Sequence, residues 1–260
     1  MPNAAAKTLD IVLWGPTNAG KTMMLARLYL QSVEFESQWE ILPTEESSQF
    51  IADMRNAINR DNLFPEPTTL AHSEQVVYLF RNRQSGAAAT LSIVDRAGAH
   101  YTELEEQTRQ HLAQADGLLL LFDPSREKET LKREVQNTLE HVYVSKAAGS
   151  GAKDERPYAV CLSKADILLK SPADHELACR APHQFVIDRI EADLVGWLER
   201  FCKNFQLFPV SSVGVRVSQD DLEPVVFFDE KLTPRLAPDA RPLNLIEPFA
   251  WLLAQLEDHL

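Results

Sequence analysis

A short segment near the start of the chain has the residues and the spacing to hold a phosphate group. Residues 15–22 read Gly-Pro-Thr-Asn-Ala-Gly-Lys-Thr, which fits the pattern G-x-x-x-x-G-K-[ST]. An apolar run at 11–14 precedes the segment and a helical pattern follows it, as a phosphate-binding loop requires. A plain glycine turn between a strand and a helix is the alternative, but it does not call for this lysine and threonine.

The chemistry of such a loop assigns a role to each part of it. Its backbone N–H groups and the positive end of the following helix can surround a polyphosphate. Lys21 would reach the outer phosphates, and the hydroxyl of Thr22 would ligate Mg²⁺. The remaining predicted binding positions of this loop are Gly15, Asn18, Ala19, Gly20 and Met23.

Three later segments carry polar residues directly after predicted buried strands. Ligands of open α/β sheets bind at the carboxyl ends of the strands, so these segments are expected to meet the phosphate loop. Asp95 follows one strand and would hold Mg²⁺ directly or through water, while the N–H of Gly98 meets the terminal phosphate. The other two segments are Ser163-Lys164-Ala165-Asp166 and Ser211-Ser212-Val213.

These two segments resemble the base-reading motifs of GTPases. Ser163-Lys164-Ala165-Asp166 resembles [NT]-K-x-D, in which the aspartate accepts hydrogen bonds from the ring N–H and amino group of guanine and the lysine lies along the base. Ser211-Ser212-Val213 resembles the serine-alanine turn whose backbone N–H binds the guanine carbonyl. Each motif alone arises often by chance, and Asp95 could merely cap a turn. Their order and spacing after Lys21 nevertheless indicate guanine, and nearly the whole chain resembles a P-loop GTPase of the Ras-like, translation-factor-related class.

Hydrophobic patterns predict the elements that would position these residues. Buried strands are expected at 11–14, 117–123, 158–162 and 207–210, a hairpin at 75–94, and helices at 102–115, 127–146, 185–201 and 245–256. Residues 32–44 read as irregular. The alternation predicts an α/β fold with a doubly wound, mostly parallel sheet and one antiparallel edge strand. We expect a single domain over 1–260, with an inserted helix at about 45–62 and an irregular segment at about 216–242 that carries a short strand at 225–228.

Composition narrows the class of protein further. The chain has 260 residues, an apolar fraction of 45% and a net charge of -12, which excludes a sequence-independent nucleic-acid binder. The three cysteines are far apart, so neither a disulfide framework nor a cysteine metal site is expected. We find no secretory signal, lipidation motif, direct membrane anchor or membrane-spanning run, and we expect a cytoplasmic protein.

A narrower resemblance concerns the loop after the inserted helix and the end of the chain. Residues 64–68 and 244–253 look like those of bacterial double-GTPase proteins found in conflict and signalling gene neighbourhoods. The resemblance implies that Thr68 is the switch I threonine, whose hydroxyl and carbonyl meet Mg²⁺ and the γ-phosphate. Thr69 is the competing choice, and two threonines in an ordinary proline-rich loop are the plainer alternative.

Two departures from Ras-like proteins bear on hydrolysis. Ras-like proteins orient the attacking water with a glutamine where this chain has Ala99, and His100 is a candidate substitute by proximity only. Asn18 resembles the asparagine of GTPases related to ribosome assembly and tRNA modification, some of which bind a K⁺ ion that replaces an arginine finger. The alternative is that Asn18 hydrogen-bonds within its own loop. No internal arginine finger can be assigned, although Arg96 is near enough to be suspected.

The sequence therefore carries three functional hypotheses. The first is a Mg²⁺-dependent GTP-binding protein, a slow GTPase that switches between GTP and GDP states and signals to a protein effector or regulator. The second is a module that holds GTP or GDP without hydrolysis, which Ala99 favours. The third, an ATPase or kinase, requires the Lys164–Asp166 motif to be coincidence and offers no acceptor site. The resemblance leaves open a nucleotide-dependent dimer, as several glutamine-lacking GTPases form.

Overall fold

The computed structural model describes residues 7–34, 38–61, 74–84, 86, 88–95, 106–146, 152–218, 221–237 and 239–257. In these residues the main sheet contains β1 (Lys7–Trp14), β2 (Trp39–Pro43), β3 (Glu74–Asn82), β4 (Ala88–Asp95), β5 (Gly117–Phe122), β6 (Asp154–Leu162) and β7 (Cys202–Pro209). Smaller sheets contain β8 (Ser211–Val217), β9 (Leu222–Glu223), β10 (Val226–Phe228), β11 (Pro234–Leu236) and β12 (Arg241–Leu243). The helices are α1 (Lys21–Glu34), α2 (Glu45–Asp61), α3 (Glu106–Gln114), α4 (Lys128–Lys146), α5 (Pro172–Arg180), α6 (Pro182–Ile187), α7 (Ala192–Phe201) and α8 (Glu247–Glu257), with a 3-10 turn η1 (Ala165–Leu168).

The main sheet has the strand order β2-β3-β4-β1-β5-β6-β7. Strands β4, β1, β5, β6 and β7 pair in parallel, whereas β3 is antiparallel to both of its neighbours, β2 and β4. The predicted doubly wound, mostly parallel sheet with antiparallel pairing at one edge is confirmed. Because the order reverses around β1, the crevice at its carboxyl end is where such a fold binds ligands.

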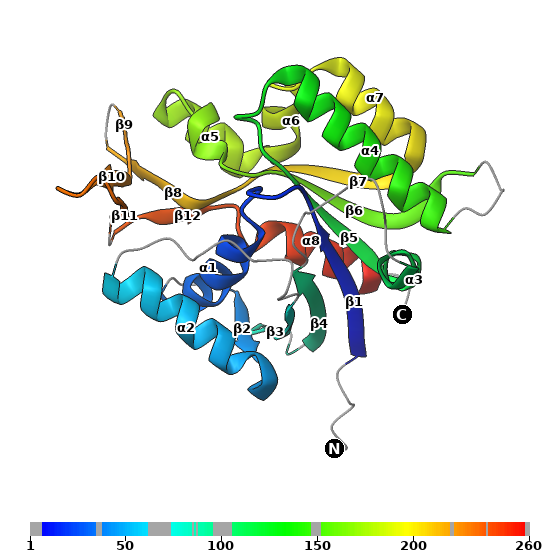
Figure 1. Ribbon diagram of the computed structural model, residues 1–260, viewed down its shortest axis with the longest axis horizontal. Coiled ribbons are helices and arrows are strands. Elements are labelled where there is room, and N and C mark those ends of the chain that lie inside the picture. Colours follow the sequence, from blue (N-terminus) through cyan, green and yellow to red (C-terminus); the bar gives the residue numbers. More distant parts are fainter. Residues whose placement is uncertain are drawn as a thin grey trace.

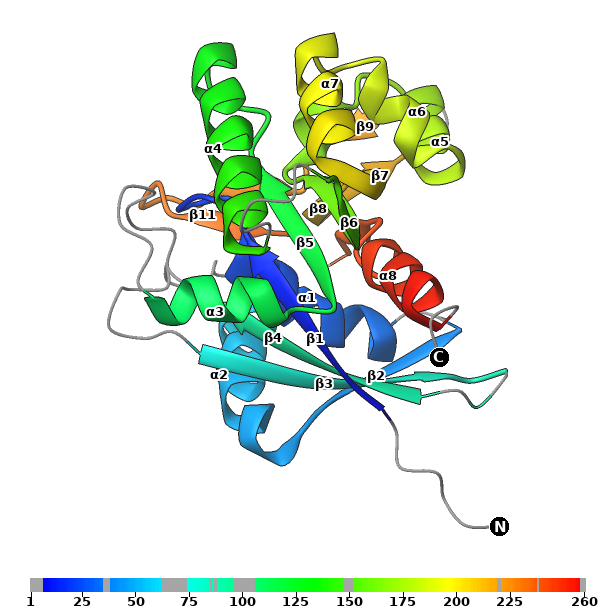
Figure 2. The ribbon, with the colours of Figure 1, turned by 90° about the vertical axis from the view of Figure 1, so that its right-hand side faces the viewer.

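Helices cover both faces of the main sheet, as Figures 1 and 2 show, with α4 to α7 on one side and α1 and α2 on the other. Strand β1 shows why both faces need cover: successive side chains of a strand point to opposite faces of the sheet, and those of β1 enter two different cores. Leu9, Ile11 and Leu13 join a core with α1 and α8, whereas Val12 joins a core with α3, α4 and α7. Strand β5 is buried along its whole length, as expected for a central parallel strand. No helix among the described residues is both long and apolar enough to cross a membrane.

Several sequence predictions were wrong in detail. Residues 39–43 were expected to be irregular but form the edge strand β2. Ile41 is buried there whereas its apolar neighbour Leu42 is 38% exposed, so the sequence lacks the alternation of apolar and polar residues that would have indicated a strand. The single helix expected over 185–201 is two helices, α6 and α7. Glu191 lies between them in extended conformation and pairs with Lys132 of α4, while the apolar spacing continues across the break.

The segment at 216–242 was expected to be irregular apart from a short strand at 225–228, which is confirmed as β10, but further short strands are also present. Strand β10 pairs with β11, and β12 pairs with β8 in antiparallel fashion. Strands β10, β11 and β12 have only 3 residues each, and the segment contains several prolines, which cannot donate to a β ladder. The buried side chains Val225 and Leu236 pack the segment against α1 and α2.

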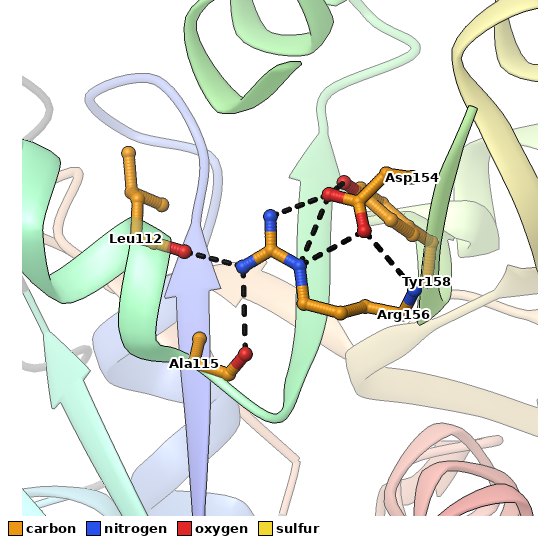
Figure 3. A network of polar contacts seen from close by, with 5 residues as sticks. All are labelled: Leu112, Ala115, Asp154, Arg156 and Tyr158. Carbon is orange, nitrogen blue, oxygen red and sulfur yellow. Dashed lines mark hydrogen bonds and ion pairs between the residues drawn. The ribbon is translucent and has the colours of Figure 1, made fainter. Parts of the chain in front are cut away.

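Asp154 and Arg156 form a buried ion pair at the start of β6, and Arg156 also connects this strand to the end of α3 (Figure 3). The Nε of Arg156 donates to both carboxylate oxygens of Asp154 at 3.1 and 3.0 Å, and Tyr158 donates to the same carboxylate at 2.7 Å. Arg156 also donates to the carbonyl oxygens of Leu112 and Ala115, beyond which β5 begins. Burial raises the pKa of Asp154, but hydrogen bonds from Arg156 and Tyr158 outweigh it and hold that pKa below its usual value.

We expect Asp154→Asn to lower the free energy of unfolding by about 3–5 kcal/mol, because it leaves the Arg156 cation buried without its carboxylate. The control is Glu155→Gln in the same strand, which removes an ion pair to Lys203 whose side chains are 64% and 77% exposed. That change is expected to cost less than about 1 kcal/mol. Urea unfolding of both variants measures the two changes in the free energy of unfolding. Equal losses would show that the buried pair stabilises the protein no more than the exposed pair does.

Candidate nucleotide site

The predicted phosphate loop connects β1 to α1 with a backbone that only certain residues accept. Asn18 and Gly20 both have positive φ angles, 67° and 90°, and asparagine and glycine are the residues that tolerate this region best. The N–H of Ala19 donates to the carbonyl of Pro16 at 3.2 Å and closes the turn. At Gly15 a Cβ atom would lie 2.4 Å from the carbonyl oxygen of Leu121, so the loop starts in close contact with β5.

Lys21, the first residue of α1, is the charged centre of this loop. It is 6% exposed, and its Nζ donates to the carbonyl oxygens of Gly15 at 2.9 Å and Pro16 at 3.2 Å. The ammonium therefore lies against the loop that precedes it, where it adds to the positive helix N-terminus. Thr22 and Met23 follow in the first turn of α1. The sequence correctly predicted that a strand, this loop and a helix would follow one another.

The first predicted base-reading segment, residues 163–166, follows β6. Ser163 is buried, and both its N–H and its hydroxyl donate to the carbonyl of Phe122 on β5, at 2.9 and 3.1 Å. Lys164 adopts the left-handed conformation, with a φ of 51°. Its Nζ lies 2.5 Å from Oδ2 of Asp123, a residue directly after β5. The segment is thus bonded to the end of β5 through backbone and side chains.

Sequence reasoning missed Asp123. A carboxylate directly after the fully apolar strand β5 was the available signal, because that strand ends at the same edge as β1 and β6. Asp123 is 2% exposed. Burial raises its pKa, but hydrogen bonds from Lys164 and Ser125 outweigh the burial and bring the pKa below its usual value. It therefore stays ionised beside Lys164 at neutral pH.

Asp166 links the two predicted base-reading segments. Its Oδ1 accepts a hydrogen bond from the hydroxyl of Ser211 at 2.5 Å, and that hydroxyl oxygen accepts one from the N–H of Gly214 at 2.8 Å. Backbone bonds reinforce the link, since the N–H of Ala165 donates to the carbonyl of Val210 at 3.0 Å. Burial is the largest influence on Asp166 and raises its pKa above the usual value, although Ser211 and Lys164 oppose the shift.

The second segment, Ser211 to Val213, opens β8. Ser211 is fully buried, whereas Ser212 and Val213 are partly exposed at this edge. Asn244 supports the segment from behind by donating through Nδ2 to the carbonyl oxygens of Pro209 at 3.0 Å and Ala178 at 2.8 Å. From the sequence, Asn244 was noted only as the first residue of the ending that looks like that of double-GTPases. Its hydrogen bonds could not be predicted because they connect three separate parts of the chain.

The predicted metal corner is described in part. Asp95 is the last residue of β4, and the parallel pairing of Ile11 with Ile93 brings that end of β4 beside the end of β1. A threonine hydroxyl and a carboxylate are oxygen ligands of the kind that Mg²⁺ prefers, so the residue types of Thr22 and Asp95 fit this ion. The predicted residues outside the described part of the chain are Thr68, Thr69, Arg96, Gly98, Ala99 and His100.

The strand order, the phosphate loop and the linked segments after β6 and β7 define a P-loop GTPase. A family model described as Double-GTPase 2 matches residues 11–222, which is most of the chain and includes all of these segments. The chain belongs to the Double-GTPase 2 family, and the predicted resemblance to double-GTPases is confirmed.

Solved structures add a distant likeness. The Arl6 (BBS3) small GTPase of Trypanosoma brucei, with the bound nucleotide analogue GppNp, is 15% identical, with a TM-score of 0.46, and the match covers 97% of this chain and 99% of that chain. A likeness at this level assigns no role to any residue here. Among curated proteins, no sequence matches the chain significantly.

Gly214 gives a test of how tightly the second segment is built. Its φ is 76°, and a Cβ atom would lie 1.6 Å from the carbonyl oxygen of Arg241 on β12. We expect Gly214→Ala to lower the free energy of unfolding by about 2–4 kcal/mol and to weaken nucleotide binding, since β8 and β12 must separate. The control Gly196→Ala, on α7 with open space around it, should stabilise the protein by up to about 1 kcal/mol. Equal thermal shifts for the two variants would contradict this account.

Proposed function

We propose that this protein is a Mg²⁺-dependent guanine-nucleotide switch that hydrolyses GTP slowly and signals its state to a protein partner. The observation that carries the proposal is the hydrogen bond from Ser211 to Asp166, which joins the two base-reading segments at the sheet edge that also holds the phosphate loop. Membership of a GTPase family supports guanine as the base.

Each residue of the site has a role in this proposal. Lys21 and the N–H groups of residues 15–23 bind the phosphates, while Thr22, Asp95 and Thr68 are the candidate Mg²⁺ ligands. Bound Mg²⁺ would neutralise charge on the phosphate oxygens. Asp166 would accept the hydrogen bonds of the guanine edge and Lys164 would lie along the base. The backbone of Ser211 to Val213 would bind the guanine carbonyl, and Ser163 would hold the first segment against β5.

The proposal also covers which groups would assist the hydrolysis of GTP. No arginine finger can be assigned, so we propose that a K⁺ ion at the exposed Asn18 supplies the positive charge of such a finger. Ala99 cannot orient water, and His100 is a weaker candidate for that task. The second candidate function, a module that holds GTP or GDP without turnover, is favoured by Ala99 itself. In such a module hydrolysis would not remove the γ-phosphate and would carry no signal. The bound nucleotide would then have a structural role in an assembly.

We further propose how the switch reaches a partner. Thr68 and Gly98 would contact the γ-phosphate in the GTP state and release it in the GDP state, which changes the surface that an effector or regulator reads. A nucleotide-dependent dimer is a second form of the same readout. Residues 1–260 would act as one domain in the cytoplasm, with α2 and the segment at 216–242 as additions to the nucleotide-binding core.

Asp166→Asn tests the choice of base. Replacing the carboxylate removes the acceptor for two guanine N–H groups, so GTP affinity should fall about 100-fold, whereas xanthosine triphosphate should bind better than it does to the wild type. Fluorescence titration with both nucleotides measures the two changes. The control is Asp188→Asn, an exposed carboxylate that accepts a hydrogen bond from Nε2 of Gln184 at 2.6 Å. Unaltered guanine preference in Asp166→Asn would show that Asp166 does not read the base.

Phosphate release under multiple turnover tests hydrolysis. We expect slow release that is roughly tenfold or more faster in KCl than in NaCl at equal ionic strength, because K⁺ would take the place of an arginine finger. Asn18→Ala should abolish the difference between the salts, and Asn137→Ala on α4 should not. Equal rates in the two salts would remove the role of Asn18. No release in either salt would leave the non-hydrolysing module.

A further inference from the structure

The turn that follows β5, residues 123–126, is built rigidly by its own hydrogen bonds. Oδ1 of Asp123 accepts from the N–H of Ser125 at 2.9 Å and from the Ser125 hydroxyl at 2.6 Å. The N–H of Arg126 donates back to the carbonyl of Asp123 at 3.2 Å. An aspartate that bonds to its own backbone two residues on is a stable turn former, so the orientation of both end residues is fixed.

One end of this turn contacts the base-reading side of the site. Oδ2 of Asp123 pairs with Nζ of Lys164 at 2.5 Å, while Oδ1 is already bonded to Ser125. A lysine side chain loses considerable rotamer entropy when it is held in one conformation. Because Asp123 is buried and hydrogen-bonded to Ser125, it supplies that restraint in the protein itself, before any base arrives to stack against the lysine stem.

The other end contacts the phosphate loop. Nη2 of Arg126 donates to the carbonyl oxygen of Thr17 at 3.1 Å. Thr17 shares this peptide group with Asn18, whose φ of 67° sets the shape of the loop. A cation on the carbonyl polarises the peptide, so the N–H of Asn18 becomes a stronger donor. Arg126 also lies near the carboxyl group of Glu134 on α4. Burial raises the pKa of Glu134, and the Arg126 cation opposes that shift.

We propose that the turn 123–126 is a positioning element of the nucleotide site. Asp123 sets Lys164 against guanine, and Arg126 sets the Thr17–Asn18 peptide against the phosphates. The inference rests on the proposed function, because both contacts act on groups assigned to a guanine nucleotide. Neither Asp123 nor Arg126 touches the nucleotide in this proposal; each acts through another residue.

The Asp123 contact is tested by a double-mutant cycle on GDP binding. Asp123→Asn should weaken GDP about tenfold in the wild-type background and have almost no effect in Lys164→Ala, because its partner is then gone. Ser125→Ala, which keeps the buried carboxylate, should give a smaller loss that also disappears in Lys164→Ala. Losses that persist undiminished in the Lys164→Ala background would show a general structural role and overturn the proposal for Asp123.

The Arg126 contact is tested by substitutions of an exposed side chain, which should fold normally. Arg126→Ala should weaken GDP and GTP about fivefold with an unchanged thermal unfolding midpoint of the nucleotide-free protein, and Arg126→Lys should recover most of the affinity. The control is Arg133→Ala, an exposed arginine on α4, which should bind as the wild type does. Equal affinity of Arg126→Ala and Arg133→Ala would overturn the role of Arg126.

The two levels of inference fail in different ways. A wild-type protein that binds neither GDP nor GTP would overturn the proposed function, and this inference with it. A wild-type protein that binds them, with Asp123 and Arg126 variants indistinguishable from it, would overturn only the role of the turn.

Discussion

The parallel hydrogen bonding of β1, β5, β6 and β7 is the constraint on which the rest of the molecule depends. It brings four strand ends to one edge, although the loops that follow them are separated by as many as about 190 residues of sequence. Parallel strands need long crossovers: α4 connects β5 to β6, and the segment with α5, α6 and α7 connects β6 to β7. The site is therefore a property of strand direction before it is a property of any side chain.

Polar contacts, most of them buried, then connect the neighbouring loops. Ser163 joins the ends of β6 and β5, Ser211 joins the two predicted base-reading segments, and Asp123 bonds to Lys164, while the exposed Arg126 bonds to Thr17 of the phosphate loop. The buried bonds strengthen one another in a region of low dielectric. A ligand that enters this framework needs little further ordering of the described loops, which favours binding.

The sequence predicted what is encoded locally. The phosphate loop, the fully apolar β5 and the strand hairpin are read from consecutive residues, and all three are present in the structure. It missed β2, the break between α6 and α7, and the contacts of Asp123 and Arg126. Each of these depends on a partner distant in the chain: β3 for the edge strand, α4 for Glu191, Lys164 for Asp123, and Thr17 for Arg126.

The contact between Gly15 and β5 separates two kinds of evolutionary constraint within one motif. Gly15 is fixed by the backbone of Leu121, a contact that exists whether or not a nucleotide is present. A descendant that had lost its ligand would still need this glycine, whereas Lys21 would keep only its hydrogen bonds to the carbonyl oxygens of Gly15 and Pro16. The glycine is thus constrained by the scaffold alone, and the lysine by the scaffold and the proposed ligand together.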